Sequence, residues 1–331
     1  MSNLIDVSMF FNEVELLKTR LESLNEVVDK FIVIESNQSF KGDFKQPILP
    51  GLVDIKTRFG EKLIFITRDE NYLNYEDLLF KLSTSNSNFS KEEGQYLSKI
   101  MASHDHYDKS KLHLLLDTFQ REACSIYIKR LSNSEDLIIF SDADELPDNI
   151  DDIKKHFCFN NIIDKNQQVI SLRQHEFWYY PNIYHDSQWE GSLCGFSSQL
   201  TSSSLNWLRL KNGINRMNTN KMDTVNGYHL TNMGGIERLK TKIKNWTHQE
   251  YNNKHIINSL EKKIIRGEDI FMRKSGTVTK LVKLNEYYSE SYRKNIQSSN
   301  LPLAKDILYK KRNFINEIFN KIFLKIINKF N

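Results

Sequence analysis

Two aspartates follow a short apolar segment near the middle of the chain. Residues 137–140 are Leu, Ile, Ile and Phe, which is typical of a buried strand in a parallel sheet. Ligands of open α/β sheets bind outside the carboxyl ends of strands, so Asp142 and Asp144 would lie within reach of a ligand. Mg²⁺ and Mn²⁺ prefer oxygen ligands, and a protein often supplies only one or two of them beside water and a substrate diphosphate. The pattern therefore predicts a metal–diphosphate site. An acidic turn that caps a helix after Pro147 is the alternative interpretation of the same residues.

The N-terminal part of the chain alternates predicted strands and helices. Residues 5–11, 31–34 and 63–66 are apolar enough to form strands, and leucines recur at helical spacing between the first two. Asn12 and Glu15 have the spacing of a capping box at the start of that helix. Strand, helix and strand in this order indicate right-handed crossovers, so we expect an α/β fold with a central, mostly parallel sheet.

Three further features complete the first half. Apolar residues from 112 to 126 lie on one helical stripe, which predicts a long helix before the central strand. Residues 83–108 are polar, with Ser and Asn crowded at their start, and predict an inserted loop or lid. Glu13, Glu35 and Asp69 each follow a strand end, so we expect them at the sheet edge that holds the two aspartates.

Aromatic residues are dense in the second half of the chain. Residues 169–172 predict another strand, and Trp178, Tyr180 and Trp189 follow it. The C–H faces of sugar rings stack on such side chains, but aromatic residues also bury large apolar areas in an ordinary core. Trp189 favours a sugar site somewhat more than the others, because polar residues and Gly191 flank it.

Paired glycines and a basic tail stand out further along. Gly234 and Gly235 precede a predicted helix, where they allow either close approach of a phosphate to the backbone or simply a tight turn. From 305 to 330, Ile, Leu and Phe recur at helical spacing with Lys and Arg beside them. Such a basic amphipathic helix can lie in a membrane interface, and a helix packed on the domain is the alternative.

Composition narrows the class of protein. The 331 residues are 39% hydrophobic and 27% charged, as expected of a globular protein with a real core. A net charge of +4 is small for this length and does not favour nucleic acid as a partner. The three cysteines are too widely spaced for a metal cluster or a disulfide framework, which favours a reducing compartment. Residues 1–11 do not resemble a signal peptide, and no stretch is apolar for long enough to span a membrane, so we expect a cytoplasmic protein.

Six motifs, taken in order, carry a resemblance to a known family. They are Phe10-Phe11-Asn12-Glu13, Val33-Ile34-Glu35-Ser36-Asn37, Phe140-Ser141-Asp142-Ala143-Asp144-Glu145-Leu146-Pro147-Asp148, Gly227-Tyr228-His229, Gly234-Gly235-Ile236-Glu237-Arg238 and His248-Gln249-Glu250-Tyr251. Over about residues 4–275 the chain resembles glycosyltransferase family 17. The tail and residues 83–108 lie outside the resemblance.

The resemblance implies a GT-A-type nucleotide-sugar-binding fold. We expect one domain over residues 1–300, with a donor- and metal-binding half at 1–150 and an acceptor half at 151–300, followed by the helical tail at 301–331. The family implies Mn²⁺ or Mg²⁺, a UDP-sugar donor (N-acetylglucosamine is one candidate sugar) and transfer with inversion. Without an N-terminal anchor or secretory signal, the chain is similar to members that build surface polysaccharide in the cytoplasm. The acceptor would then be a glycan or lipid-linked glycan, with the tail at the inner face of the membrane.

The resemblance also suggests roles for individual residues. The metal would be held by Asp142 and Asp144, oriented by Glu145, with His229 completing the shell. The donor would contact residues after the first strands and on the long helix, namely Asn12, Glu13, Glu35, Gln120, Arg121 and Asp142. The acceptor would contact Trp178, Trp189, Gly234 and Gly235. The expected general base is Asp269, then Glu268, with Glu190 and Glu176 in reserve.

Several of these residues have a purely structural alternative. Asn12 can cap a helix, Arg121 can face solvent opposite the apolar stripe, and a single histidine such as His229 is more often structural. Glu268 and Asp269 can be acids at a helix N-terminus, stabilised by the helix dipole.

Two other functions are compatible with the same residues. A sugar nucleotidyltransferase also uses carboxylate-bound Mg²⁺, but it needs a Gly-rich, basic triphosphate loop near the first strand, which residues 10–13 do not provide. A non-catalytic carbohydrate-binding protein could retain the fold, although the intact Asp142 and Asp144 argue against it.

Overall fold

The computed structural model describes residues 2–84, 88–160, 169–212, 221–271 and 279–305. These residues form one ten-stranded sheet in the order β10-β7-β6-β8-β4-β1-β2-β3, with β9 pairing to β6 and β5 to β9. The strands are β1 (Leu4–Phe10), β2 (Lys30–Ser36), β3 (Leu63–Arg68), β4 (Leu137–Asp142), β5 (Glu145–Pro147), β6 (Ile170–Trp178), β7 (Ile183–Trp189), β8 (Leu193–Phe196), β9 (Lys221–Thr231) and β10 (Thr279–Leu281).

The first half of the sheet is parallel. β1 lies between β2 and β4 and is parallel to both, and β3 continues the parallel order beyond β2. All of the antiparallel pairs involve strands that follow β4, and β6 and β9 add one more parallel pair. The predicted α/β class with a central, mostly parallel sheet is therefore confirmed. The carboxyl ends of β1, β2 and β4 meet at one edge, as the sequence predicted.

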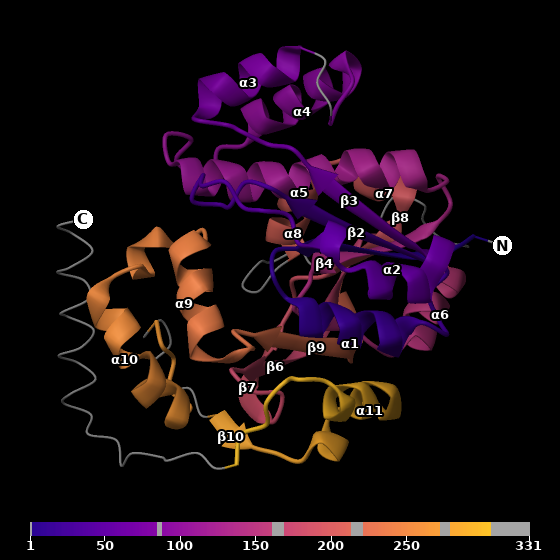
Figure 1. The fold of residues 1–331 in the computed structure, drawn as a ribbon. Helices are drawn as coiled ribbons and strands as arrows, with labels where there is room; N and C mark the ends of the chain where they lie inside the picture. The colour runs from indigo at the N-terminus through magenta and orange to yellow at the C-terminus, as the bar shows by residue number, and fades with distance from the viewer. Residues whose placement is uncertain (1, 85–87, 161–168, 213–220, 272–278, 306–331) are drawn as a thin grey trace.

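Helices cover both faces of this sheet (Figure 1). They are α1 (Val14–Leu24), α2 (Val53–Phe59), α3 (Tyr75–Ser83), α4 (Lys91–Ser103), α5 (Leu112–Leu131), α6 (Ile150–Asn160), α7 (Ser197–Thr201), α8 (Leu205–Asn212), α9 (Gly235–Asn245), α10 (Lys254–Ile265) and α11 (Glu290–Ser298), with 3₁₀ turns η1 (Leu49–Gly51), η2 (Gly60–Lys62), η3 (Gln249–Tyr251) and η4 (Leu284–Glu286). The predicted long helix is confirmed as α5.

Two apolar cores hold the layers together. One packs α1, α2, α6 and α11 against one face of the sheet. The other packs α3, α4, α5 and α8 against the opposite face, where α3 and α4 lie outside α5 (Figure 1). A third, smaller cluster joins α9 and α10 to Trp178 and Tyr179 at the end of β6. In the part of the chain that the structure describes, no helix combines the length and apolarity needed to cross a membrane.

Two local predictions differ from the structure, and a third concerns residues that the structure does not describe. Residues 83–108 are not simply a loop, because α4 lies within them and begins at a capping box formed by Ser90 and Glu93. The capping box predicted at Asn12 is wrong, because α1 begins only at Val14 and its N-cap residue is Glu13. The amphipathic tail predicted over 305–330 lies, from residue 306 on, outside the described residues.

Candidate active site

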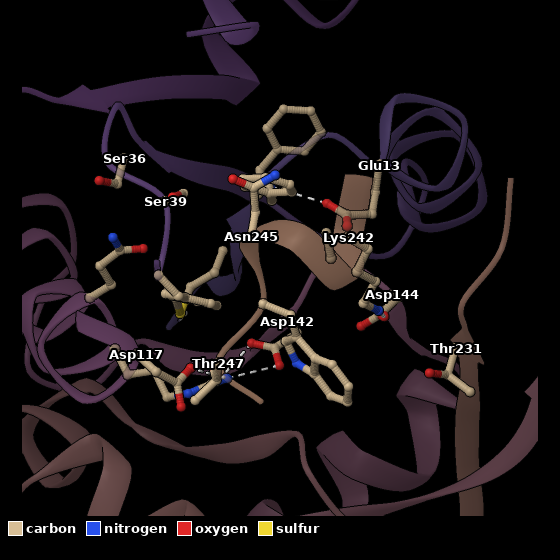
Figure 2. A pocket seen from close by; sticks show the side chains of 18 of the residues that line it. Glu13, Ser36, Ser39, Asp117, Asp142, Asp144, Thr231, Lys242, Asn245 and Thr247 are labelled. Carbon is tan, nitrogen blue, oxygen red and sulfur yellow. Dashed lines mark hydrogen bonds and ion pairs between the residues drawn. The ribbon is translucent and has the colours of Figure 1, made fainter. Parts of the chain in front are cut away.

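A pocket of about 440 Å³ opens at the sheet edge where β1, β2 and β4 end. Its walls come from the segments after these strands, from α5 and α8, and from β9 and α9 across the opening. Figure 2 shows Asp142 and Asp144 in the pocket together with Glu13 and Lys242. The two aspartates therefore lie in a cavity of the size that holds small-molecule ligands.

A buried arginine fixes the acidic turn after β4. Arg20 of α1 is fully buried and forms a two-point ion pair with Asp6 of β1, with both N–O distances at or below 2.7 Å. The same guanidinium donates to the backbone carbonyls of Asp142 (3.2 Å) and Glu145 (2.6 Å) and to Ser141 Oγ (2.6 Å). Its planar group with several N–H donors thus links α1, β1 and the turn after β4, and it fixes the backbone that carries Asp142 and Asp144.

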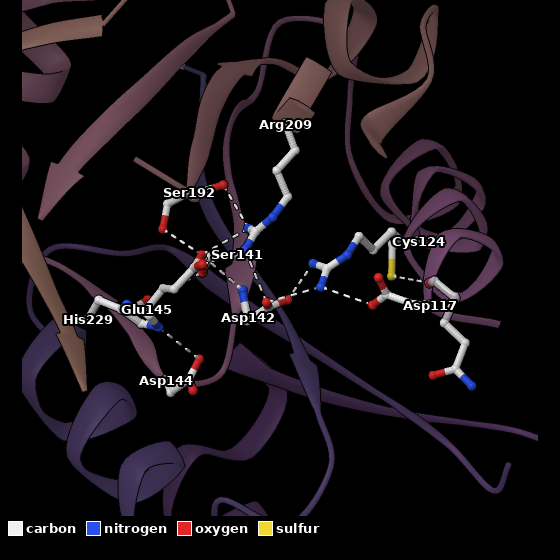
Figure 3. A network of polar contacts seen from close by, with 12 residues as sticks. Asp117, Cys124, Ser141, Asp142, Asp144, Glu145, Ser192, Arg209 and His229 are labelled. Carbon is white, nitrogen blue, oxygen red and sulfur yellow. Dashed lines mark hydrogen bonds and ion pairs between the residues drawn. The ribbon is translucent and has the colours of Figure 1, made fainter. Parts of the chain in front are cut away.

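Asp142 is bound by two arginines. Arg121 of α5 donates to its two carboxylate oxygens at 2.6 and 3.2 Å, and Arg209 of α8 donates to Oδ2 at 3.1 Å (Figure 3). Burial opposes ionisation, but the two guanidinium groups outweigh it and hold the pKa of Asp142 well below its usual range. Arg121 also pairs with Asp117 at 3.2 Å. Asp142 therefore anchors a cationic wall of the pocket, and its oxygens are already engaged by that wall.

Glu145 connects this wall to an aromatic side chain. The fully buried carboxylate accepts from Arg209 (2.5 and 3.0 Å), Ser192 (3.0 Å) and the indole Nε1 of Trp189 (2.6 Å). Trp189 lines the pocket and stacks on His229 with 4.4 Å between ring centroids. Gly191 makes this possible, since a Cβ there would lie 2.2 Å from Trp189 Nε1 and 2.3 Å from Glu145 Oε1.

Asp144 and His229 form the part of the site best suited to a cation. Asp144 Oδ1 faces His229 Nε2 at 3.9 Å, beyond hydrogen-bond distance, and Oδ2 accepts from Lys242 at 3.2 Å. Burial works against ionisation of Asp144, but Lys242 and His229 lower its pKa overall. Among the described residues, no three metal-ligating side chains cluster together. The residues present fit a hard cation held by Asp144 and His229 with other ligands from water and diphosphate. The metal-binding role of Asp142, whose oxygens accept from Arg121 and Arg209, stays a prediction.

The residues predicted to bind the donor fall into two groups. Glu13, Gln120 and Arg121 line the pocket, and Asn12 stands next to it, where its Oδ1 accepts from Arg238 at 3.2 Å. Glu35 lies outside the pocket lining: it is fully buried, and its carboxylate accepts from the backbone N–H groups of residues 48 and 49 and pairs with Lys45. Its environment is that of a structural carboxylate.

Paired glycines at the start of α9 leave room for an arginine. A Cβ at Gly234 would lie 2.6 Å from Arg238 Cδ. Arg238 folds over this glycine to donate to Met233 O (2.8 Å) and to pair with Glu13 (3.0 Å). Gly234 and Gly235 are not among the residues that line the pocket, so the structure gives them a role in shaping the turn.

Three of the four acids predicted as general base are not brought into the pocket. Asp269 is buried and its Oδ1 accepts from the backbone N–H of Phe271, while Glu268 is exposed. Glu190 pairs with Lys221 at 3.1 Å. None of these three lines the pocket, and the catalytic role predicted for each stays a prediction.

Glu176, the reserve candidate, does line the pocket. Its carboxylate accepts from Trp178 Nε1 (2.9 Å) and His185 Nδ1 (3.1 Å) and also from Ser187. Burial opposes ionisation, but these donors and the nearby His229 lower its pKa. Trp178 itself stacks on His185 and packs in the smaller core, so it is not among the lining residues.

Three basic residues of the site were not predicted from sequence. Arg20 carried a signal, because it interrupts the apolar stripe of α1 between Leu17 and Leu21 and so must be buried with a partner. Arg209 and Lys242 gave none, since each lies on a short helix with other basic residues and only the tertiary fold brings it to the aspartates.

Comparisons with known proteins bear on the first part of the chain. The sequence model of glycosyltransferase family 17 matches residues 1–69. Among curated proteins, none matches this chain.

Two solved structures show a weak similarity to the structure of this chain. HddC from Yersinia pseudotuberculosis is 8% identical with a TM-score of 0.30, over 70% of this chain and 91% of its own. Mouse xyloside xylosyltransferase 1 is 11% identical with a TM-score of 0.31, over 62% of this chain and 69% of its own. Likeness this weak adds nothing on function. The resemblance predicted from the motifs is nevertheless confirmed over residues 1–69, where the chain matches glycosyltransferase family 17, and this match supports a role in glycosyl transfer.

Proposed function

We propose that this protein is a metal-dependent, inverting glycosyltransferase that moves a sugar from a UDP-sugar to a glycan or lipid-linked glycan. One observation carries the proposal: Asp144 and His229 face each other in a pocket whose wall also holds Arg121, Arg209 and Lys242. A nucleoside diphosphate needs positively charged groups around its leaving phosphate, and these three basic side chains, which stand beside Asp142 and Asp144, would provide them.

The basic side chains would bind and orient the donor. Arg121 and Arg209 are held in place by Asp142 and Glu145, so their guanidinium charges are fixed where they would attract phosphate oxygens. Lys242 reaches Asp144 from α9 across the opening and would turn to the diphosphate when donor is bound. Asp144 and His229 would hold Mn²⁺ or Mg²⁺, which supplies neutralisation of the diphosphate as it leaves.

The acceptor would approach from the side of Trp189 and Glu176. Trp189 is fixed by Glu145 and by stacking on His229, so it offers a rigid face for a sugar ring. Glu176 is the one acid among the predicted general bases that lines the pocket, and position within reach of the attacking hydroxyl is the first requirement of a general base; the donors around it lower its pKa and so make it a weaker base. We therefore prefer Glu176 to Asp269 as the general base.

Binding of UDP gives a first test. We expect UDP to raise the melting temperature of the protein when Mn²⁺ is present and to do so much less when the metal is chelated, because binding to the folded state stabilises it. Asp144→Asn should keep its own melting temperature close to that of the wild type and lose the effect of Mn²⁺. Equal stabilisation by UDP with and without metal, in both proteins, would refute the metal-dependent part of the proposal.

A further inference from the structure

The pocket extends away from Asp144 toward the ends of β2 and β3. This end is lined by Ile34, Ser36, Gln38, Ser39, Phe40 and Arg68. Figure 2 shows Ser36 and Ser39 on one side of the pocket and Asp144 on the other. The two ends are joined by Gln120 and Arg121 of α5, so one extended ligand could contact both.

Arg68 has hydrogen-bonding capacity that the protein does not use. Its side chain is 1% exposed, and within the described part of the chain neither Nε nor Nη1 has a hydrogen-bond partner. Glu70 lies 3.2 Å from Nη1 and balances the charge, but without hydrogen-bond geometry. A buried N–H group without an acceptor is costly, so such donors are usually matched by a ligand or water.

Ser39 repeats this pattern in the same part of the pocket. Its side chain is 2% exposed, and its hydroxyl has no hydrogen-bond partner among the described residues. Its backbone is fixed, because its N–H donates to Asp43 O at 2.9 Å. The neighbouring Ser36 and Gln38 are different, since Ser36 donates to Glu70 and Gln38 exchanges hydrogen bonds with Tyr72.

Apolar side chains surround these two polar groups. Met9 and Ile34, at the ends of β1 and β2, line the pocket, and Phe11 and Phe40 add aromatic faces. A flat ring would bury its faces against such side chains, while oxygen atoms at its edge would accept from Arg68 and Ser39. A heteroaromatic base with carbonyl groups has this combination of faces and edge.

We propose that this end of the pocket is the subsite for the nucleobase of the donor, and that Arg68 and Ser39 select a base that presents carbonyl oxygens, with uracil as the expected one. The inference rests on the proposed function. A nucleobase is expected here because the Asp144 end of the pocket is proposed to bind the diphosphate of a nucleotide sugar. Uracil carries two carbonyl oxygens, guanine and cytosine carry one, and adenine carries none. A site with buried hydrogen-bond donors discriminates strongly against a ligand without matching acceptors, because binding that ligand leaves the donors unpaired.

The test is binding of UDP, GDP, CDP, ADP and inorganic diphosphate, each with Mn²⁺, measured by calorimetry on the full chain. We expect the wild type to bind UDP most tightly and ADP at least about tenfold more weakly. Ser39→Ala should weaken UDP binding severalfold and leave binding of inorganic diphosphate unchanged. It should not lower the melting temperature, because the hydroxyl has no partner to lose.

Two further variants make the test decisive. Ser8→Ala is the matched control: Ser8 on β1 also has a buried hydroxyl without a described partner, but it does not line the pocket, so UDP binding should not change. The double variant Arg68→Met/Glu70→Gln removes the guanidinium without leaving a buried charge unpaired, and it should abolish the preference for UDP over ADP.

Some results would overturn the inference. UDP and ADP bound equally by the wild type, or UDP bound by Ser39→Ala and the double variant as by the wild type, would show that the base lies elsewhere. In both cases binding of UDP and of inorganic diphosphate would still support the proposed function. A wild type that binds none of the nucleotides would refute the proposed function and the subsite together.

Discussion

Asp144 Oδ1 and His229 Nε2 lie 3.9 Å apart at the carboxyl end of the central strand, too far for a direct hydrogen bond and close enough to share a cation. Asp144 comes from the turn after β4 and His229 from β9, so the fold joins residues that are far apart in sequence. Backbone pairing fixes their approach, because Glu145 of β5 lies opposite His229 in the register of β5 and β9.

The two residues of this pair should affect activity alike. Asp144→Asn and His229→Gln each remove one proposed ligand, and we expect kcat/KM for transfer to fall about 100-fold or more, because charge neutralisation by a bound metal is worth several kcal/mol. Titration with Mn²⁺ during the transfer assay checks the cause: the metal concentration needed for half of the remaining activity should rise in both variants. A normal response to Mn²⁺ in both would contradict a shared ligand role.

The general base can be identified by comparing three acids. Glu176→Gln should leave UDP affinity nearly unchanged and lower kcat by about 10²–10⁴-fold, because loss of a base appears in turnover and not in donor binding. Asp269→Asn and Glu190→Gln are the comparison variants, since both acids are buried but do not line the pocket. A large loss of kcat in Asp269→Asn with normal activity in Glu176→Gln would reverse our assignment.

Gly191 should be required for the position of Trp189. Gly191→Ala places a Cβ against Trp189 Nε1 and Glu145 Oε1, so the indole must move. We expect about 1–3 kcal/mol of lost stability from overpacking and a higher KM for acceptor, with UDP affinity less affected. Gly51→Ala is the control, because a Cβ there meets nothing within 4 Å. An unchanged acceptor KM in Gly191→Ala would argue against Trp189 as the sugar platform.

Stability should fall as the pH is lowered from 7 to 5, partly through His175. Burial lowers the pKa of His175 below the usual value of about 6.5, so the unfolded chain takes up the proton first. Its contribution is therefore present above that value and lost as the pH falls through the window below it. Urea unfolding of His175→Phe should show a smaller loss over this range, with His113 and His156, whose pKa values are also lowered by burial, retaining part of it. A loss equal to that of the wild type would exclude His175.

Much of the frame of the site could be predicted from local sequence. Apolar segments that end in acids predicted the strands and the edge where Asp142 and Asp144 lie, because strand burial and chain direction are encoded locally. The choice among polar residues near that edge could not be predicted. Glu35 lies near the carboxyl end of β2 and Glu13 lies just after β1, yet the carboxylate of Glu35 holds a backbone turn and that of Glu13 lines the pocket.

Long-range placement was the part that the sequence did not reveal. Arg209 reaches Asp142 from α8, and nothing within either segment records that contact. Asp269 has an acidic neighbour and an apolar segment after it, as a catalytic acid could, but its neighbours Ile270 and Phe271 pack with α9 and α10, and Asp269 is not among the residues that line the pocket. Which side chains reach the pocket depends on how the helices and strands pack, and the residue pattern within each element does not record it.

The most direct test of glycosyl transfer at this pocket is release of UDP from a panel of UDP-sugars, measured with Mn²⁺ and with candidate glycan acceptors. We predict that at least one UDP-sugar is turned over in an acceptor-dependent way, that chelation of the metal stops the reaction, and that Asp144→Asn is nearly inactive although folded. Full turnover by Asp144→Asn, or tight UDP binding by the wild type with no sugar transferred from any donor in the panel, would contradict this assignment.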